Sequence, residues 1–73
     1  MKGGDPMLNT TVWLYKGYAK KQFLAIVNGE TAAENFCRNS SEVQDGEFIF
    51  LRTKHNIYRY RYYADNQKLV QER

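Results

Sequence analysis

The sequence predicts a small α+β domain: two β-hairpins joined by one short helix, which packs on one face of a single antiparallel sheet. Residues 10–15 and 22–27 are short stretches rich in β-branched and aromatic side chains, separated by the turn-like segment KGYAKK. Residues 47–63 alternate aromatic and arginine side chains with the period of a strand. Between the two pairs of strands, residues 30–39 have the apolar spacing of a helix. This β-β-α-β-β order is typical of two-layer domains.

The first hairpin depends on two apolar stretches. In residues 10–15, Val12 and Leu14 alternate with two aromatic residues, which predicts a strand with one face toward the core. Residues 22–27 contain five consecutive apolar residues and end at an Asn-Gly turn signal at Gly29. Such an uninterrupted run predicts a strand that is covered on both faces.

A competing interpretation makes residues 19–27 a helix, because several of their apolar residues also fall on one helical face. With a second helix over residues 31–39, this segment would form a helix-turn-helix, and residues 47–63 would be its wing. We prefer the strand, because the β-branched pair Ile26-Val27 favours extended structure and stops abruptly at the Asn-Gly turn.

The helix over residues 30–39 has signals at both ends. Thr31 and Glu34 have the spacing of a capping box, in which each side chain accepts a hydrogen bond from a backbone amide at the helix start. Arg38 suits the negative end of the helix dipole. The polar stretch NSSEVQDG then ends the helix.

The second hairpin has two possible registers, and the loop length decides between them. If the loop is residues 54–56, Phe48 and Phe50 share a face with the alternating tyrosines and belong to the core. If the loop has two or four residues, the two phenylalanines share a face with the arginines instead. In both registers Arg59 and Arg61 point away from the core, because burying unpaired arginine is too unfavourable.

Length and composition limit the remaining possibilities. The chain has 73 residues, a formal net charge of +3 and a single cysteine, Cys37. One cysteine excludes an internal disulfide and fits a reducing, cytoplasmic compartment. The longest apolar run, residues 23–27, is too short to span a membrane. No cysteine–histidine cluster, nucleophile–base pair or glycine-rich phosphate loop is evident, so we expect neither enzymatic activity nor a cofactor or metal.

The two ends of the chain are the least informative parts. Residues 1–6, MKGGDP, resemble either an expression leader followed by a natural start at Met7 or a disordered natural N-terminus, so residues 7–73 are expected to form the single domain. Residues 64–73 fit a short terminal helix, a frayed tail or a last edge strand equally well.

The basic and aromatic side chains favour a non-enzymatic nucleic-acid-binding module. Proteins commonly hold nucleic acid by stacking bases on aromatic rings and neutralising phosphates with arginine and lysine. We expect six cations to contact phosphates and one tyrosine to stack: Arg52, Arg59, Arg61, Lys16, Lys20, Lys21 and Tyr18. Whether the nucleic acid is single-stranded or duplex stays open at this point.

The alternative is a protein-interaction or inhibitor module of the kind that phages and mobile elements encode as small accessory proteins. Such a module would use its sheet face or an unpaired strand edge to dock on a partner protein or to form a homodimer. No sequence feature of a single chain separates these two functions, because the separation depends on how charges are distributed over the folded surface.

Overall fold

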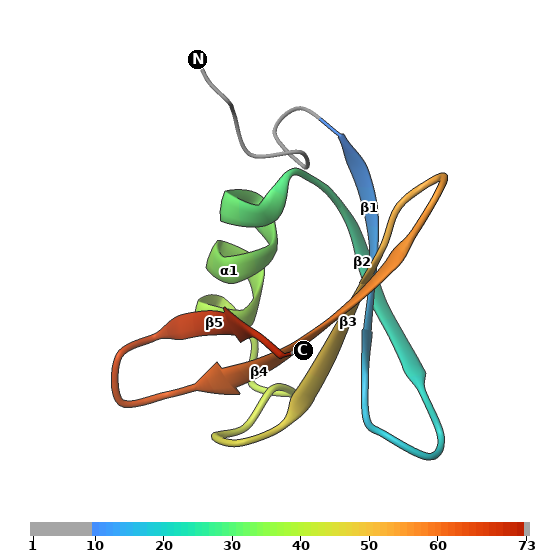
Figure 1. Ribbon diagram of the computed structural model, residues 1–73. Coiled ribbons are helices and arrows are strands. Elements are labelled where there is room, and N and C mark those ends of the chain that lie inside the picture. Colours follow the sequence, from blue (N-terminus) through green and yellow to red (C-terminus); the bar gives the residue numbers. More distant parts are fainter. Residues whose placement is uncertain (1–9, 73) are drawn as a thin grey trace.

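The computed structural model describes residues 10–72 and confirms the predicted order of elements (Figure 1). The expected leader, residues 1–6, lies outside the described residues. The helix and strands are β1 (Thr11–Lys16), β2 (Gln22–Asn28), α1 (Glu30–Asn39), β3 (Phe48–Arg52), β4 (Ile57–Tyr63) and β5 (Lys68–Gln71). The C-terminal segment is therefore an edge strand, and the helix-turn-helix interpretation is wrong because residues 22–28 form β2 rather than a helix.

The five strands form one antiparallel sheet in the order β2-β1-β3-β4-β5. The sheet curls around α1, which lies on its inner face and contacts β1 and both edge strands, β2 and β5 (Figure 1). The ten residues of α1 extend about 15 Å and cover only the inner face. Among the described residues, no helix covers the outer face, which we call the open face.

The core lies between α1 and alternate residues of the three central strands. Val12 and Leu14 of β1, with Ile49 and Leu51 of β3, are fully buried there. Tyr60 of β4 also enters the core, and its hydroxyl donates a hydrogen bond to the carboxylate of Glu30 on α1. The period of two thus sends one set of side chains toward the helix and the other set to the open face.

The register of the second hairpin answers the question that the sequence left open. Arg52 pairs with Ile57, so the loop has the four residues 53–56, and Leu51 pairs with Tyr58. The three-residue loop is therefore wrong. The four-residue loop places Phe48 and Phe50 on the face of the arginines, opposite Tyr58, Tyr60 and Tyr62.

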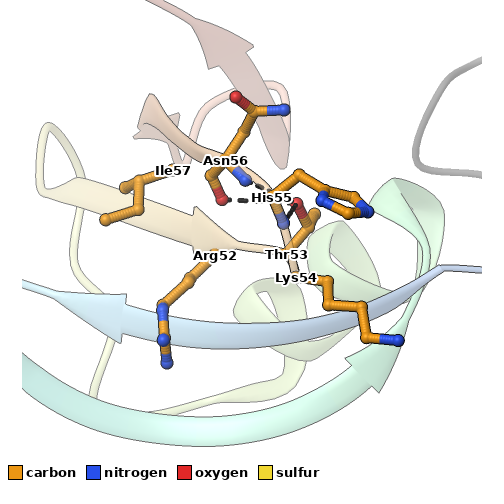
Figure 2. A pocket seen from close by; sticks show the side chains of 6 residues that line it. All are labelled: Arg52, Thr53, Lys54, His55, Asn56 and Ile57. Atoms are coloured by element: carbon orange, nitrogen blue, oxygen red, sulfur yellow. Dashed lines mark hydrogen bonds between the residues drawn. The ribbon is translucent and has the colours of Figure 1, made fainter.

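The side chain of Thr53 stabilises this four-residue loop. Its hydroxyl accepts hydrogen bonds from the backbone amides of His55 (3.3 Å) and Asn56 (3.1 Å) and donates one to the Asn56 carbonyl (3.3 Å). Figure 2 shows Thr53 at the centre of this network. Asn56 does not have a left-handed backbone, because among the described non-glycine residues only Gln67 has a positive φ. A backbone hydrogen bond from the Thr53 amide to the Asn56 carbonyl (2.7 Å) closes the turn, and the threonine side chain reinforces it.

We expect Thr53→Val to lower the free energy of unfolding by about 1–2 kcal/mol, because valine keeps the shape but loses these hydrogen bonds. Urea denaturation measures the change. Thr11→Val is the matched control: Thr11 is exposed on β1, so its substitution should alter stability by less than about 0.5 kcal/mol. A Thr53→Val variant as stable as the parent would contradict the assigned role.

Strand β2 differs from its prediction in one respect. It is an edge strand rather than a strand covered on both faces, and Phe23 and Ile26 are 50% and 58% exposed. The register shifts between the pairs Leu14–Ala25 and Tyr15–Phe23, so Leu24 is an extra residue in a β-bulge. The apolar run therefore reflects a bulge that turns Phe23 outward, and not burial on both faces.

Helix α1 covers the predicted residues 30–39, but it begins two residues earlier than a capping box at Thr31 requires. Gly29 is the residue that precedes α1, with φ 90° and ψ 168°, a conformation that essentially only glycine adopts. No side chain caps the helix start. The Glu34 carboxylate instead accepts a hydrogen bond from the Leu69 amide (2.9 Å), so it ties β5 to the helix. No helix in the described part of the chain is long and apolar enough to cross a membrane.

Candidate nucleic-acid interface

Three rows of side chains run across the open face, and the pair Tyr63 and Lys68 lies beyond the third row. The first row contains Ile26, Trp13, Arg52 and Ile57. The second row contains Phe23, Tyr15, Phe50 and Arg59. The third row contains Phe48, Arg61 and Val70. In the first two rows, aromatic rings lie toward β2 and arginines lie toward β4, so the face has a ring side and an arginine side.

Exposed apolar side chains of the described residues gather on this face. The large hydrophobic residues that are more than about a third exposed are Tyr18, Phe23, Ile26, Ile57, Tyr63 and Val70. Strand register places five of them on the open face, and Tyr18, from the β1–β2 loop, packs on the ring of Phe48 at 5.0 Å between centroids. An apolar surface collected on one face, beside cations, is typical of a binding surface.

The cations of the open face lie over aromatic rings. The Arg61 guanidinium lies 4.4 Å and that of Arg59 5.6 Å from the centroid of the Phe48 ring. Arg52 lies 5.7 Å from the Trp13 ring, and the Lys21 amine lies 4.5 Å from the Phe50 ring. These cation–π contacts favour positions of the charged groups close to the sheet.

The carboxylates of the described residues lie mostly elsewhere. They are found on α1, in the segment between α1 and β3, and in the β4–β5 turn: Glu30, Glu34, Glu42, Glu47, Asp45 and Asp65. Glu72 alone contacts an arginine of the open face, with 3.6 Å between its Oε2 and Nε of Arg61. None of the ion pairs between described residues involves Lys21, Arg52 or Arg59. The folded chain therefore separates its charges, with unneutralised cations on the open face.

Two adjoining hollows lie at the end of the face near the β3–β4 turn. The first, the sheet hollow, has a volume of about 300 Å³ and is lined by Tyr15, Lys21, Phe50, Arg52 and Ile57. The second, the turn hollow, has about 430 Å³ and is lined by residues 52–57 (Figure 2). Arg52 and Ile57 line both hollows, which therefore adjoin. The sheet hollow offers an aromatic wall beside two cations.

The structure brings together most, but not all, of the residues that the sequence indicated. Arg52, Arg59 and Arg61 lie side by side on the open face, and Tyr18 and Lys21 pack onto it from the β1–β2 loop. Their proposed contacts with nucleic acid remain a prediction.

The lysines of the basic loop point in different directions. Lys16 pairs with Ile49 and lies on the inner side of the sheet, where its amine donates a hydrogen bond to the Glu42 carbonyl (2.6 Å). The same amine is 3.5 Å from the Glu47 carboxylate. Lys16 therefore fastens the segment that follows α1 to β1 and lies apart from the arginines. Lys20 is exposed at the tip of the same loop.

Sequence reasoning left three rings of the ring side out of the candidate site: Trp13, Tyr15 and Phe23. A signal for the first two was present, because both alternate with the core residues of β1. Trp13 and Tyr15 can contribute to a binding site only if the second face of the sheet is uncovered. A single helix covers only one face, so the number of helices decides this. Phe23 could not be placed because its outward direction depends on the bulge at Leu24.

The remaining chemistry-bearing side chains do not form a cluster. Cys37 is buried on the inner side of α1, whereas His55 is exposed at the tip of the β3–β4 hairpin. Within residues 10–72, no three side chains of His, Cys, Asp or Glu gather in a way that could hold a metal ion.

Cys37 should be unreactive in the native protein. Burial raises the pKa of its thiol to about 12, and the nearby carboxylates of Glu34 and Glu47 act in the same direction. Because the folded pKa lies above the ordinary value of 9.0, the stability linked to the neutral thiol is complete below about pH 9 and is lost as the pH approaches 12. We expect a disulfide reagent at neutral pH to label Cys37 only as fast as the protein unfolds. Immediate labelling of the folded protein would contradict this.

Comparisons with known proteins identify no relative: no protein family matches the sequence, and neither a curated protein nor a solved structure matches it. The function must therefore be argued from the surface itself.

Proposed function

We propose that this protein is a non-enzymatic nucleic-acid-binding module that uses the open face of its sheet. The observation that carries this proposal is the coincidence of exposed rings and unneutralised cations on one face. A polyanion with aromatic bases complements both kinds of side chain, since phosphates pair with arginine and bases stack on rings. Because the single cysteine is a free, buried thiol, we place the module in the reducing cytoplasm.

Charge separation favours this partner over a second copy of the chain on the same surface. Two open faces brought together would oppose the unpaired cations Lys21, Arg52 and Arg59 to one another, and such like-charge contacts oppose association. An anionic partner instead gains from the same cations. The guanidinium groups are already held over Phe48 and Trp13, so little side-chain entropy is lost when they bind phosphate.

Titration of a labelled mixed-sequence oligonucleotide at several salt concentrations tests the proposal. We expect the affinity to fall steeply between about 50 and 200 mM salt, with a linear dependence of log K on log salt. Arg52→Ala should weaken binding by roughly tenfold at the lower salt concentration. Arg38→Ala removes the same charge from α1, on the other side of the sheet, and should leave the affinity unchanged. The absence of binding at low salt, or equal effects of both variants, would refute the proposal.

A second candidate function is a protein-interaction or inhibitor module, and strand β2 is the observation that favours it. β2 is an edge strand with exposed apolar side chains, which is a usual site for strand addition or homodimerisation. Light scattering separates the candidates. A monomer whose mass changes only when an oligonucleotide is added supports nucleic-acid binding, whereas a dimer without ligand supports assembly through the edge.

A further inference from the structure

The arrangement of the three rows points to a particular class of nucleic acid, and this inference rests on the proposed function. We propose that the open face binds single-stranded nucleic acid, with the phosphate backbone along the arginine side and the bases turned toward the ring side. Each row across the sheet would then hold one nucleotide. The second row shows the pattern most clearly, because it runs from Phe23 and Tyr15 to Arg59.

The spacing of the rows fits an extended strand. Arg59 and Arg61 are separated by one residue on β4, so their Cα atoms lie about 6.8 Å apart at roughly 3.4 Å per residue. Successive phosphates of an extended single strand are separated by a comparable distance. A backbone that runs parallel to β4 can therefore present a phosphate to each arginine in turn.

The ring side provides stacking surfaces at the corresponding places. Phe23 is half exposed and packs edge-on against Tyr15, with 5.5 Å between ring centroids. Tyr18 is 60% exposed over Phe48 in the third row. Because any base has a stacking face, such rings hold a single strand with little dependence on sequence.

The sheet hollow completes one such position. Tyr15 forms part of its wall, and Lys21 and Arg52 stand beside it without a carboxylate partner among the described residues. A base can enter beside the Tyr15 ring while the flanking phosphates meet the two cations. The size of the face limits the site to roughly two or three stacked bases, as on other sheets that bind RNA.

A duplex fits this surface poorly. From β2 to β4 the face extends across three strand spacings, or about 14 Å at roughly 4.8 Å each. The major groove of B-DNA is about 12 Å wide and accepts a helix or a two-stranded ribbon, so the curved face of a wider sheet cannot reach base edges there. Paired bases also cannot stack on the rings. A duplex can therefore contact the cations only through its backbone.

The test compares three labelled probes of the same mixed sequence, each of roughly a dozen nucleotides: single-stranded DNA, single-stranded RNA and duplex DNA. We expect both single strands to bind at least about tenfold more tightly than the duplex at equal salt. Trp13, the only tryptophan of the chain, lies on the ring side, so its fluorescence should be quenched by the single strands and not by the duplex. A strong preference for RNA over DNA would identify contacts to the 2′-hydroxyl.

Ring-removing variants separate stacking from charge. Phe23→Leu and Tyr18→Leu change exposed side chains, and each should weaken single-strand binding by about fivefold or more while duplex binding and the salt dependence stay the same. Phe36→Leu, which removes a ring from α1, is the matched control and should have no effect. Equal affinity for the duplex, or unchanged single-strand binding in both ring variants, would overturn the single-strand inference while leaving the proposed function intact. If no probe binds, the proposed function itself fails.

Discussion

The Arg59→Ala/Arg61→Ala variant is expected to bind a single-stranded oligonucleotide roughly a hundredfold more weakly than the parent at low salt. Hydrogen bonds to charged groups contribute about 1.5–3 kcal/mol each, and we take the lower part of that range because one of the two arginines, Arg61, already has a carboxylate neighbour in Glu72. The slope of log K against log salt should also fall by about 1.4, because each lost phosphate contact on a single strand contributes about 0.7.

Two controls make this result specific. The conservative variant Arg59→Lys/Arg61→Lys keeps the charge but not the planar fork, so it should retain most of the salt dependence and lose part of the affinity. Urea denaturation of the alanine variant checks that the fold survives, since both arginines also lie over the Phe48 ring. A folded alanine variant that binds as tightly as the parent would contradict the role of the arginine side.

The Leu51→Ala variant is expected to lose about 2–5 kcal/mol of unfolding free energy, the range found for leucine-to-alanine changes in cores. Leu51 is fully buried in the central strand β3, between Leu14 of β1 and Tyr58 of β4. A domain of this size has a free energy of unfolding of roughly 4–11 kcal/mol, so a substantial fraction of the variant molecules should be unfolded at moderate temperature. Thermal and urea denaturation measure the loss.

The matched control for Leu51→Ala lies one residue pair away. Ile57 is 62% exposed on the open face, and Ile57→Ala should change the stability by less than about 0.5 kcal/mol. Comparison of the two variants also tests the hairpin register, because a three-residue loop would put Leu51 on the face of Arg59. A larger loss for Ile57→Ala than for Leu51→Ala would contradict the register described above.

The order of elements could be predicted from the sequence because each element has a local signal. Alternation in β1 and β4, and the helical spacing of α1, are readable within single segments. The bounds of α1 were predicted correctly, but the capping box at Thr31 was wrong because the capping residue is Gly29, whose unusual backbone conformation replaces a side-chain cap. The sequence could not show that β2 and β5 are the edge strands of the sheet, because strand order depends on tertiary packing.

The candidate site could be predicted only in part, because its composition depends on the register of one hairpin. Both registers send Arg59 and Arg61 outward, so that prediction needed no knowledge of the loop. The position of Phe48 depended on whether the loop has three or four residues, and hydrogen bonds from both the backbone and the hydroxyl of Thr53 stabilise the four-residue loop. The direction of Lys16 was unpredictable for a related reason, since its partners lie in a segment distant in sequence.

The most direct test of the open face as a nucleic-acid interface is a nitrogen–proton correlation spectrum recorded during addition of a single-stranded oligonucleotide. The arginine Nε–H and tryptophan indole N–H signals report on side chains of known position. We expect the signals of Arg52, Arg59, Arg61 and Trp13 to shift with added oligonucleotide, while that of Arg38 on α1 stays in place. Shifts confined to Arg38, or a spectrum that does not change at low salt, would contradict the assignment of function to this face.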